Sequence, residues 1–358
     1  MPRNTVMKPR NVRRAGLAAF FVGALLVAAP ANAQETFEGN TRSVSKRGTT
    51  AADFLSIPVG ARAAAMGNAI SASVDDLTSI YWNPAGLAAV RQGNVTAEYA
   101  QWLADVDFNF FAIAAPTGAG TIGLAITSMR TPEMEVTTVD DQYGTGETFT
   151  ASSYALALSL GRQLTDRFGV GASIKYVSER IWNSNAGGVA MDIGTMFVTP
   201  FSGIRLGASI SNFGTKMQLT GDDLLVKVDI DPNNGGNNES NRAFLSTGEF
   251  DMPLTMRIGL AGEVFQSDKA RLTLAVDALN PNNSEQYVNV GAELGLAGDL
   301  LMIRGGYSEL FLADNVRSLT VGAGLNYRFA PLYLSFDYSY EVMEYFTDIN
   351  RFTVSLRW

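Results

Sequence analysis

The chain has 358 residues, of which 46% are hydrophobic and 17% are charged, with 27 basic and 35 acidic residues. It contains no cysteine and no histidine, which excludes disulfides, Ser-His and Cys-His catalysis and the commonest transition-metal ligands. The acidic excess argues against nucleic-acid binding, because that requires basic surface. We therefore predict no enzyme, no catalytic residues, no metal site, no cofactor and no nucleic-acid partner.

Residues 1–33 have the pattern of a secretory signal peptide. Three arginines precede an apolar run at 17–29, and the small residues Ala31 and Ala33 form a cleavage site. A membrane-anchoring helix is the alternative, but the run is shorter than the roughly 20 residues needed to span a bilayer. We expect cleavage after Ala33, which leaves 22 basic and 35 acidic residues and a net charge of −13.

From residue 93 onward, apolar and polar residues alternate in segments that are separated by Gly, Pro, Asn and Asp, a pattern typical of strands. Outer-membrane barrels contain an even number of antiparallel strands. We predict an all-β membrane protein in which residues 92–358 form a 14-stranded antiparallel outer-membrane β-barrel surrounded by lipid. The predicted strands are 93–102, 105–116, 119–130, 149–162, 166–180, 185–199, 202–213, 252–265, 268–280, 286–297, 299–308, 317–329, 331–342 and 347–358.

Loop lengths decide between this barrel and a soluble β-sandwich, whose strands would also alternate. Outer-membrane barrels have short periplasmic turns and longer outer loops in strict alternation. The predicted connections follow that rule, with long loops at 131–148, 214–251 and 309–316 and one short outer hairpin, 103–104, as the exception. The short turns are at 117–118, 163–165, 200–201, 266–267, 298 and 330.

The two faces of each predicted strand differ in chemistry. One face carries large apolar side chains and is expected to contact lipid, whereas the other carries Gly, Ser, Thr and charges and suits a crowded polar lumen. Phe111 and Ile113 are the best apolar candidates for the lumen. We expect the lumenal charges to pair with the wall or with a plug: Lys175, Asp192, Arg205, Arg257, Glu263, Asp277, Glu293, Arg304, Arg328 and Asp337.

The last predicted strand is typical of the closing strand of a bacterial outer-membrane barrel, which the barrel-assembly machinery reads. Phe352, Val354, Leu356 and Trp358 occupy alternate positions, and the chain ends on an aromatic residue. We expect these four side chains to face lipid, with Trp358 at the periplasmic rim. The strand is expected to pair with the first one near 95–101.

Residues 51–91 are rich in alanine and do not alternate. Asn83 followed by Pro84 indicates a helix start. We predict that this segment is a helical hatch or plug in the lumen or across the periplasmic mouth. A small periplasmic domain outside the barrel is the alternative. Residues 34–50 are predicted to be an N-terminal periplasmic extension.

Motifs within 54–88 resemble the N-terminal signature of the PorV/PorQ family, a branch of the FadL-like outer-membrane barrels. The resemblance implies fourteen strands and a lumenal N-terminal hatch, and we interpret the motif as hatch architecture. Its residues are Gly60, Arg62, Met66, Gly67, Asp75, Asp76, Trp82, Asn83, Pro84, Ala85 and Gly86.

This resemblance implies two functions. The first is a role in type IX protein secretion, in which outer loops hold secreted cargo or contact secretion-system components, and we predict this one. The alternative is FadL-like passive transport of hydrophobic small molecules with lateral exit from the barrel. The acidic loop 214–251 offers a docking surface, although Phe244 and Phe250 are its main aromatic anchors. Its carboxylates could hold calcium, but their spacing matches no known calcium loop, and we favour a solvated loop.

Overall fold

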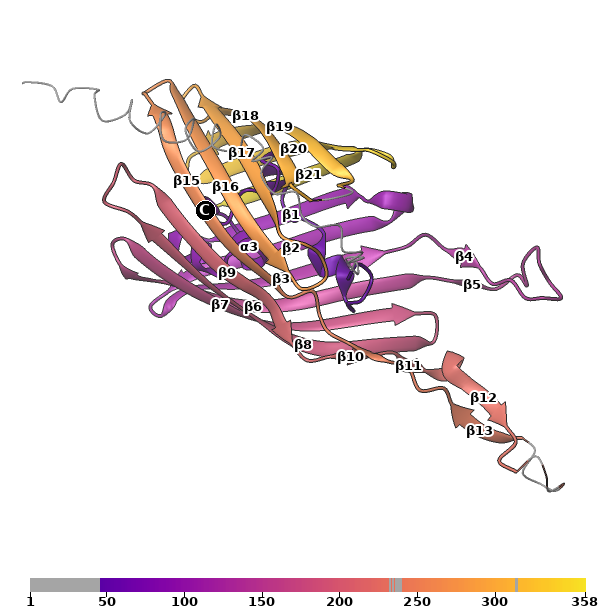
Figure 1. The fold of residues 1–358 in the computed structure, drawn as a ribbon. Coiled ribbons are helices and arrows are strands. Elements are labelled where there is room, and N and C mark those ends of the chain that lie inside the picture. Colours follow the sequence, from indigo (N-terminus) through magenta and orange to yellow (C-terminus); the bar gives the residue numbers. More distant parts are fainter. Residues whose placement is uncertain (1–45, 232, 234, 236–239, 313–314) are drawn as a thin grey trace, which may run out of the picture.

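The computed structural model describes residues 46–231, 233, 235, 240–312 and 315–358. Fourteen antiparallel strands follow one another in chain order around a wall, and the first pairs with the last, which closes a barrel (Figure 1). The strands are β1 (Asn94–Gln101), β2 (Asp107–Thr117), β3 (Gly120–Arg130), β6 (Ala151–Thr165), β7 (Phe168–Ile181), β8 (Ser184–Val198), β9 (Arg205–Gly214), β15 (Thr255–Gln266), β16 (Ala270–Pro281), β17 (Tyr287–Leu296), β18 (Leu301–Leu310), β19 (Arg317–Phe329), β20 (Leu332–Met343) and β21 (Ile349–Arg357).

All fourteen predicted strands are confirmed, and each bound lies within three residues of the predicted one. The prediction missed short strands inside two loops, where they form projecting arms (Figure 1). The first arm, 134–149, contains β4 (Met134–Glu135) and β5 (Thr148–Phe149). The second arm, 217–250, contains β10 (Met217–Gln218), β11 (Thr220–Gly221), β12 (Leu225–Val228), β13 (Asn241–Phe244) and β14 (Glu249–Phe250).

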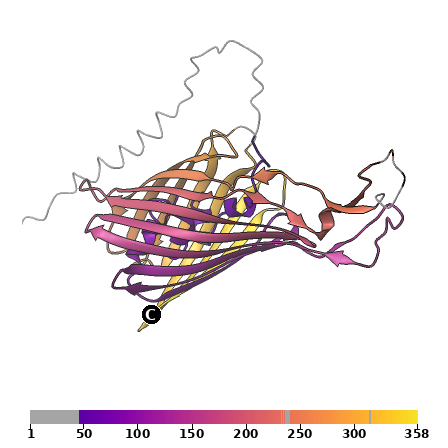
Figure 2. The ribbon, with the colours of Figure 1, turned by 90° about the horizontal axis from the view of Figure 1, so that it is seen from below.

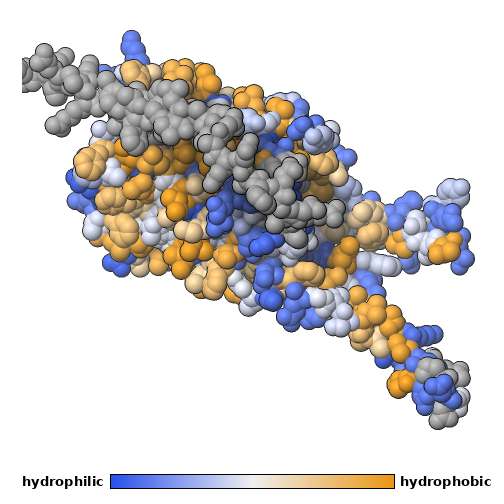
Figure 3. Space-filling model, viewed as in Figure 1, coloured by the Kyte–Doolittle hydropathy of each residue, from blue (hydrophilic) through white to orange (hydrophobic). Residues whose placement is uncertain are grey.

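The wall strands turn their apolar side chains outward, as the alternation predicts. Leu325 and Phe336 keep 49% and 44% of their surface exposed, whereas Thr320 and Ser339 on the opposite face are almost fully buried. Figure 3 shows apolar side chains spread over the outside of the barrel. An exposed apolar belt of this kind is stable in lipid, which makes the outer face the membrane-facing one. None of the helices in the described part of the chain is long and apolar enough to cross a membrane.

The two ends of the barrel differ in the length of their connections. At the short-turn end, connections of two to six residues join β2 to β3, β6 to β7, β8 to β9, β15 to β16, β17 to β18 and β19 to β20, and the C-terminus lies there (Figure 2). At the long-loop end lie the two arms. Residues 103–104 were predicted to be the one short connection at the long-loop end. A second one exists, because residues 182–183 alone join β7 to β8.

Residues 53–90 form an inner segment that lies inside the barrel. It is built from one-turn pieces rather than long helices: η1 (Asp53–Ser56), α2 (Ala61–Ala65), α3 (Ser79–Trp82) and η2 (Pro84–Ala89). Most of its side chains are buried, and its backbone bonds to wall residues on several strands.

The inner segment begins at the long-loop end. The Ala51 N–H donates to the Asp251 carbonyl at 2.9 Å, and Asn283 in the β16–β17 loop donates to the Asp53 carboxylate at 3.0 Å. Residues 46–50 therefore lie at the long-loop end, opposite the end predicted to face the periplasm. The periplasmic extension at 34–50 stays a prediction, and from residue 51 the chain runs through the lumen from the long-loop end toward the short-turn end. Residues 34–45 lie outside the described part of the chain.

Glycines on the lumenal face allow the inner segment to approach the wall. A Cβ atom on Gly171 would lie 2.2 Å from the Pro84 carbonyl carbon, and one on Gly306 would lie 2.2 Å from the Gly67 nitrogen. No side chain fits at those distances, so backbone packs on backbone. The glycines that alternate with apolar residues in the strand sequences therefore allow the inner segment to pack against the wall.

Candidate functional site

The first half of the motif fixes the inner segment to the wall. Gly60 adopts φ +94°, and its N–H donates to the Glu98 carboxylate at 2.5 Å. Met66 is fully buried, and the N–H of Gly67, which adopts φ +61°, donates to the Thr320 hydroxyl at 3.0 Å. Positive φ angles favour glycine at both positions, which explains why the motif requires it there.

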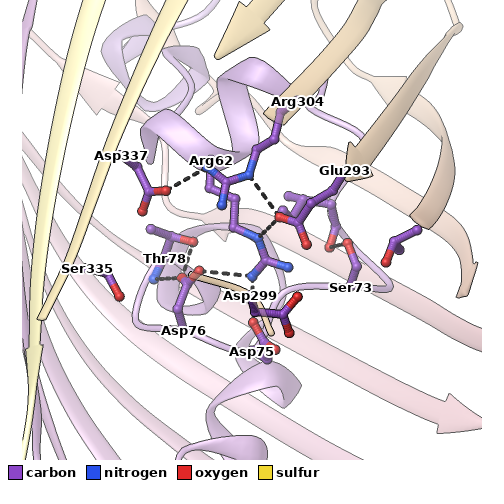
Figure 4. Close-up of polar contacts among 12 residues, drawn as sticks. Arg62, Ser73, Asp75, Asp76, Thr78, Glu293, Asp299, Arg304, Ser335 and Asp337 are labelled. Carbon is purple, nitrogen blue, oxygen red and sulfur yellow. Dashed lines mark hydrogen bonds and ion pairs between the residues drawn. The ribbon is translucent and has the colours of Figure 1, made fainter. Parts of the chain in front are cut away.

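Arg62 connects both halves of the motif to the wall (Figure 4). Its Nε donates to Glu293 Oε2 at 3.0 Å, and Arg304 Nε donates to the same oxygen at 2.8 Å. Its Nη1 lies 2.5 Å from Asp75 Oδ1 and 3.4 Å from Asp76 Oδ2. The sequence predicted wall-to-plug pairing for Glu293 and Arg304 but did not indicate that Arg62 was the partner.

Further ion pairs extend this cluster across β16, β17, β18 and β20. Arg271 lies 3.1 Å from Glu293 and 3.3 Å from Asp299, and Arg304 lies 2.6 Å from Asp337. Glu293 thus contacts three guanidinium groups. We call these residues the ion network; they surround a cavity of about 180 Å³ near the short-turn end: Arg62, Asp75, Asp76, Arg271, Glu293, Asp299, Arg304 and Asp337.

Three groups of the ion network, Arg62, Asp75 and Asp76, belong to the inner segment rather than to the wall strands. Removal of water opposes the charge on Asp75, but the Arg62 guanidinium outweighs that effect and lowers the pKa of Asp75 below its usual value. Removal of water likewise opposes the charge on Arg62, and Glu293, Asp75 and Asp76 together raise the pKa of Arg62. Both groups are therefore ionised across the physiological pH range.

The second half of the motif, Trp82 to Gly86, shapes the C-terminal part of the inner segment. Trp82 donates its indole N–H to a backbone carbonyl at 2.7 Å. Asn83 accepts the Ala85 N–H at 3.1 Å, and Pro84 stands at the first position of η2, so the predicted helix start is confirmed. A Cβ atom on Gly86 would lie 2.7 Å from a backbone oxygen. These residues hold the backbone of the inner segment in place. Of the five, Trp82 alone lines a cavity near the long-loop end.

Most other predicted lumenal charges lie in pairs or bind backbone. Lys175 contacts Asp192 at 2.8 Å, and Arg205 contacts Glu263 at 2.9 Å. Asp277 accepts two backbone N–H groups of the inner segment at 2.9 and 2.8 Å. These contacts are of the wall-to-wall and wall-to-plug kinds.

Arg257 and Arg328 are different, because neither makes an ion pair with any residue that the structure describes. Arg328 is exposed near the end of β19. Arg257 is buried; its Nη1 donates to the Ser211 hydroxyl at 2.8 Å, and its guanidinium lies 5.7 and 5.4 Å from the ring centres of Tyr81 and Trp82.

The predicted apolar lumen residues were assigned to the wrong face. Phe111 and Ile113 are exposed on the outside, whereas Phe108 and Phe110 are buried inside. The physical reason is the register of β2: side chains at even positions point inward there, which a sequence segment apolar on both faces did not reveal. The buried phenylalanines join an apolar cluster that includes Phe54, Leu55, Met217 and Met252.

The predicted closing strand pairs with the first strand as expected. Leu356 lies opposite Val95, and the Trp358 N–H donates to the Gly93 carbonyl at 2.9 Å. Phe352 and Val354 are exposed on the outer face, while the residues between them are buried. Nothing in these contacts concerns the assembly machinery, so its recognition of this strand stays a prediction.

One carboxylate of the acidic second arm, that of Asp223, connects the arm to the barrel wall. Asp223 accepts the Asn183 N–H and the Ser184 hydroxyl, each at 2.9 Å, which connects the arm to the β7–β8 turn. Phe244 and Phe250 are exposed on the arm, as is Leu245. Within the described residues, no group of three or more acidic side chains is arranged to hold a metal ion.

Three cavities lie close together near the long-loop end. The outer cavity, of about 320 Å³, is lined by residues that include Arg47, Asp53, Arg257, Tyr287, Glu309 and Arg317. The inner cavity, of about 30 Å³, is lined by residues that include Ser56, Asn68, Trp82, Arg257, Leu279 and Tyr287. The lateral groove, of about 330 Å³, is lined by residues that include Met256, Ile258, Leu279, Tyr287, Val288 and Phe311.

Tyr287 lines all three cavities and stands where the wall is irregular. The pairing of β17 with β18 shifts between Val288 and Val290, and Glu309 on the facing strand adopts φ +58°. Such a bulge interrupts the ladder of hydrogen bonds between neighbouring strands. Tyr287 therefore borders the polar cavities and the lipid-facing groove at an irregular point of the wall, and Leu279 also borders the inner cavity and the groove.

No protein-family model matches the chain, and no curated protein matches it. Solved structures do. TodX, a toluene transporter of Pseudomonas putida, has a TM-score of 0.53 at 14% identity and covers 84% of this chain and 97% of its own. TbuX, a toluene transporter of Ralstonia pickettii, has a TM-score of 0.52 at 13% identity with the same coverage. A FadL homologue of Pseudomonas aeruginosa has a TM-score of 0.50 at 13% identity and covers 84% and 98%.

At these identities the similarity shows the fold alone, a barrel like those of the three neighbours. The predicted fold class is confirmed, and none of the three neighbours is described as an enzyme. The narrower PorV/PorQ assignment stays a resemblance carried by the motif residues.

Proposed function

We propose that this barrel is a passive transporter that takes hydrophobic small molecules from the long-loop end and releases them sideways through its wall. The observation that carries the proposal is the meeting of three cavities at Tyr287. A route from the outer cavity to the lateral groove would pass Tyr287 and Leu279 beside the irregular backbone of the wall.

The part of the lumen near the short-turn end supports a sideways exit. The ion network and the close packing of the inner segment on glycines narrow the lumen toward the short-turn end. A molecule that continued straight through would have to separate several buried ion pairs, which is costly in a low-dielectric interior. The bulge between β17 and β18 offers a less obstructed path into lipid.

The neighbours named as toluene transporters support the substrate class. The lateral groove is mainly apolar, and its exposed Met256 and Ile258 side chains belong to the lipid-facing wall. A hydrophobic molecule that reached this groove would pass from protein into the hydrocarbon without crossing water.

The proposal is tested by toluene uptake into Gram-negative cells that produce the full-length barrel. Replacing Tyr287 with Ala joins the outer cavity to the lateral groove, and we expect the initial rate of uptake to rise severalfold. Tyr176→Ala is the matched control, because Tyr176 is an exposed tyrosine on β7 away from the three cavities. Wild-type uptake equal to that of cells without the barrel would refute transport, and equal rates for wild type and Tyr287→Ala would refute this route.

A role in type IX secretion is a second candidate, favoured by the two arms that extend beyond the barrel (Figures 1 and 2). Phe244 and Leu245 keep 63% and 56% of their surface exposed on the second arm, and exposed apolar groups of this kind suit a protein contact. This function predicts that deletion of residues 222–246 abolishes co-purification of secreted proteins. Transport predicts that the same deletion leaves toluene uptake unchanged.

A further inference from the structure

Two arginines lie on the outer face of the wall at the long-loop end, where the neighbouring strands β3, β6 and β7 end or begin (Figure 1). Arg130 of β3 is in register with Ser152 of β6, which is in register with Arg180 of β7. These side chains face outward, because the odd-numbered side chains of the same strands, such as Thr127 and Ser153, are buried. We call Arg130, Ser152 and Arg180 the arginine row; its two arginines are two strand spacings, or about 10 Å, apart.

The arginine row lies where the apolar belt of the wall ends. On the outer face of β6, Ser152 is followed by Tyr154, three leucines and then Arg162 at the short-turn end. Ser152 and Arg162 are about 34 Å apart along the strand, and the usual strand tilt reduces this to about 25 Å across the membrane, which is the height of the apolar band of outer-membrane barrels. Tyr154 lies beside Tyr176, with ring centres 6.3 Å apart, as in the aromatic belt at a membrane interface. The row is therefore at the height of the lipid headgroups.

Neither arginine of the row forms an ion pair with a residue that the structure describes, although both are exposed. The Nε of Arg180 donates to the Trp182 carbonyl at 2.9 Å, which orients its guanidinium. An exposed arginine at the surface of a soluble protein would be neutralised by water and salt. At the edge of the apolar belt, the groups that remain to contact these guanidinium ions are lipid headgroups.

The acidic side chains nearest to the row do not neutralise it. Asp107 of β2 is in register with Arg130, but its Oδ1 accepts the Tyr99 hydroxyl at 2.9 Å. Glu179 points into the lumen, where its Oε2 accepts the Ala52 N–H at 3.0 Å. Glu133 is exposed in the loop that follows β3 and contacts neither arginine. The two positive charges of the row thus face the membrane surface without a protein anion among the described residues.

We infer that the arginine row is a binding site for a phosphorylated glycolipid of the outer leaflet, in which Arg130 and Arg180 hold a phosphate group above Ser152. The inference goes beyond the proposed transport and does not depend on it. Guanidinium groups bind phosphate oxygens through short, charge-assisted hydrogen bonds, which can be bidentate. Basic groups at headgroup height are typical of lipid-binding sites on membrane proteins.

The place of the row in the wall favours a glycolipid over an inner-leaflet phospholipid. Long loops of such barrels face the cell surface, where the outer leaflet of a Gram-negative outer membrane carries phosphorylated glycolipid. The exposed Asn185 of β8 is in register with Arg180 and extends the row with an amide that suits sugar hydroxyls. At the opposite end of β6, Arg162 is in register with Val170 and has no second arginine beside it. Two arginines around a serine therefore occur on this strand only at the level of the outer leaflet.

The test measures binding of lipid A, the phosphorylated glycolipid that anchors lipopolysaccharide, to the purified full-length barrel in detergent by native mass spectrometry. We expect Arg130→Gln and Arg180→Gln each to weaken lipid A binding by about tenfold, since each removes charged hydrogen bonds. Arg180→Lys should lose less, because it keeps the charge and loses only the planar fork. Lipid A without its phosphates should bind weakly, and equally to the wild type and to the variants.

Arg162→Gln is the matched control, because it removes an exposed arginine on the outer face of the same strand at the opposite end of the apolar belt. It should leave lipid A binding unchanged, and heat-modified migration on gels confirms that each variant is folded. An equal loss in Arg162→Gln and Arg130→Gln would overturn the inference, because any arginine facing the membrane would then have the same effect. Phosphatidylglycerol that binds as tightly as lipid A, or displacement of lipid A by an excess of inorganic phosphate, would overturn the assignment to a glycolipid. Toluene uptake tests the proposed transport separately, so each of the two proposals can fail without the other.

Discussion

The two ends of the lumen treat buried charge in opposite ways. Near the short-turn end, Glu293 is contacted by Arg62, Arg271 and Arg304, so the charges compensate one another. Near the long-loop end, Arg257 is equally buried but has no carboxylate partner among the described residues. The compensated cluster holds the inner segment against the wall through ion pairs, whereas Arg257 contacts the inner segment through the rings of Tyr81 and Trp82.

Arginines of the same lumen are therefore stabilised in two ways, by carboxylates at Arg62 and Arg304 and by aromatic rings at Arg257. A buried ion pair stabilises a fold only when each partner is satisfied, and removal of one partner leaves a costly charge. The ion pairs between the inner segment and the wall gather near the short-turn end, whereas the cavities beside Tyr287 lie near the long-loop end.

The largest expected effect is at Glu293. Glu293→Gln leaves three guanidinium groups without their shared carboxylate, and we expect the free energy of unfolding to fall by about 3–5 kcal/mol. Urea-induced unfolding of the barrel in lipid vesicles, followed by tryptophan fluorescence, measures the change. Release of the inner segment should also make the chain near Arg62 accessible to trypsin.

Asp299→Asn is the control for this prediction. Asp299 contacts only Arg271 in the ion network, and its side chain is 44% exposed, so we expect a loss of no more than about 1 kcal/mol. Equal effects of the two substitutions would contradict the view that compensation around Glu293 closes the lumen.

The wall could be predicted from the sequence because its rule is simple. A strand with lipid on one side and a polar lumen on the other alternates with period two. Leu325 alternates with Gly324 and Asn326 in this way, and the pattern can be recognised without knowledge of how the side chains pack. The rule fails where both faces are apolar, as at Phe110 and Phe111 on β2. There the neighbouring strands determine the register.

The candidate site could be predicted only in part. Arg257 was recognised as lumenal, but whether a buried arginine has a partner depends on residues from β9, β16 and the inner segment. The bulge beside Tyr287 left no pattern in the sequence, because it arises from the pairing of β17 with β18. The motif residues around Arg62 were a usable signal, yet they indicated packing of the inner segment rather than the location of the cavities.

A smaller effect is expected at Asp75, whose side chain is 58% exposed beside Arg62. Water screens such a pair, so Asp75→Asn should cost about 0.2–1 kcal/mol at pH 7. The pKa of Asp75 is lowered in the folded protein from its usual value of 3.8, so its stabilisation is present above that value and is lost as the pH falls through the lowered pKa. Unfolding of wild type and Asp75→Asn at pH 7 and at pH 2 measures the difference. A difference that persists unchanged at pH 2 would show that Asp75 acts through packing, and the charge compensation near the short-turn end would then rest on Glu293 alone.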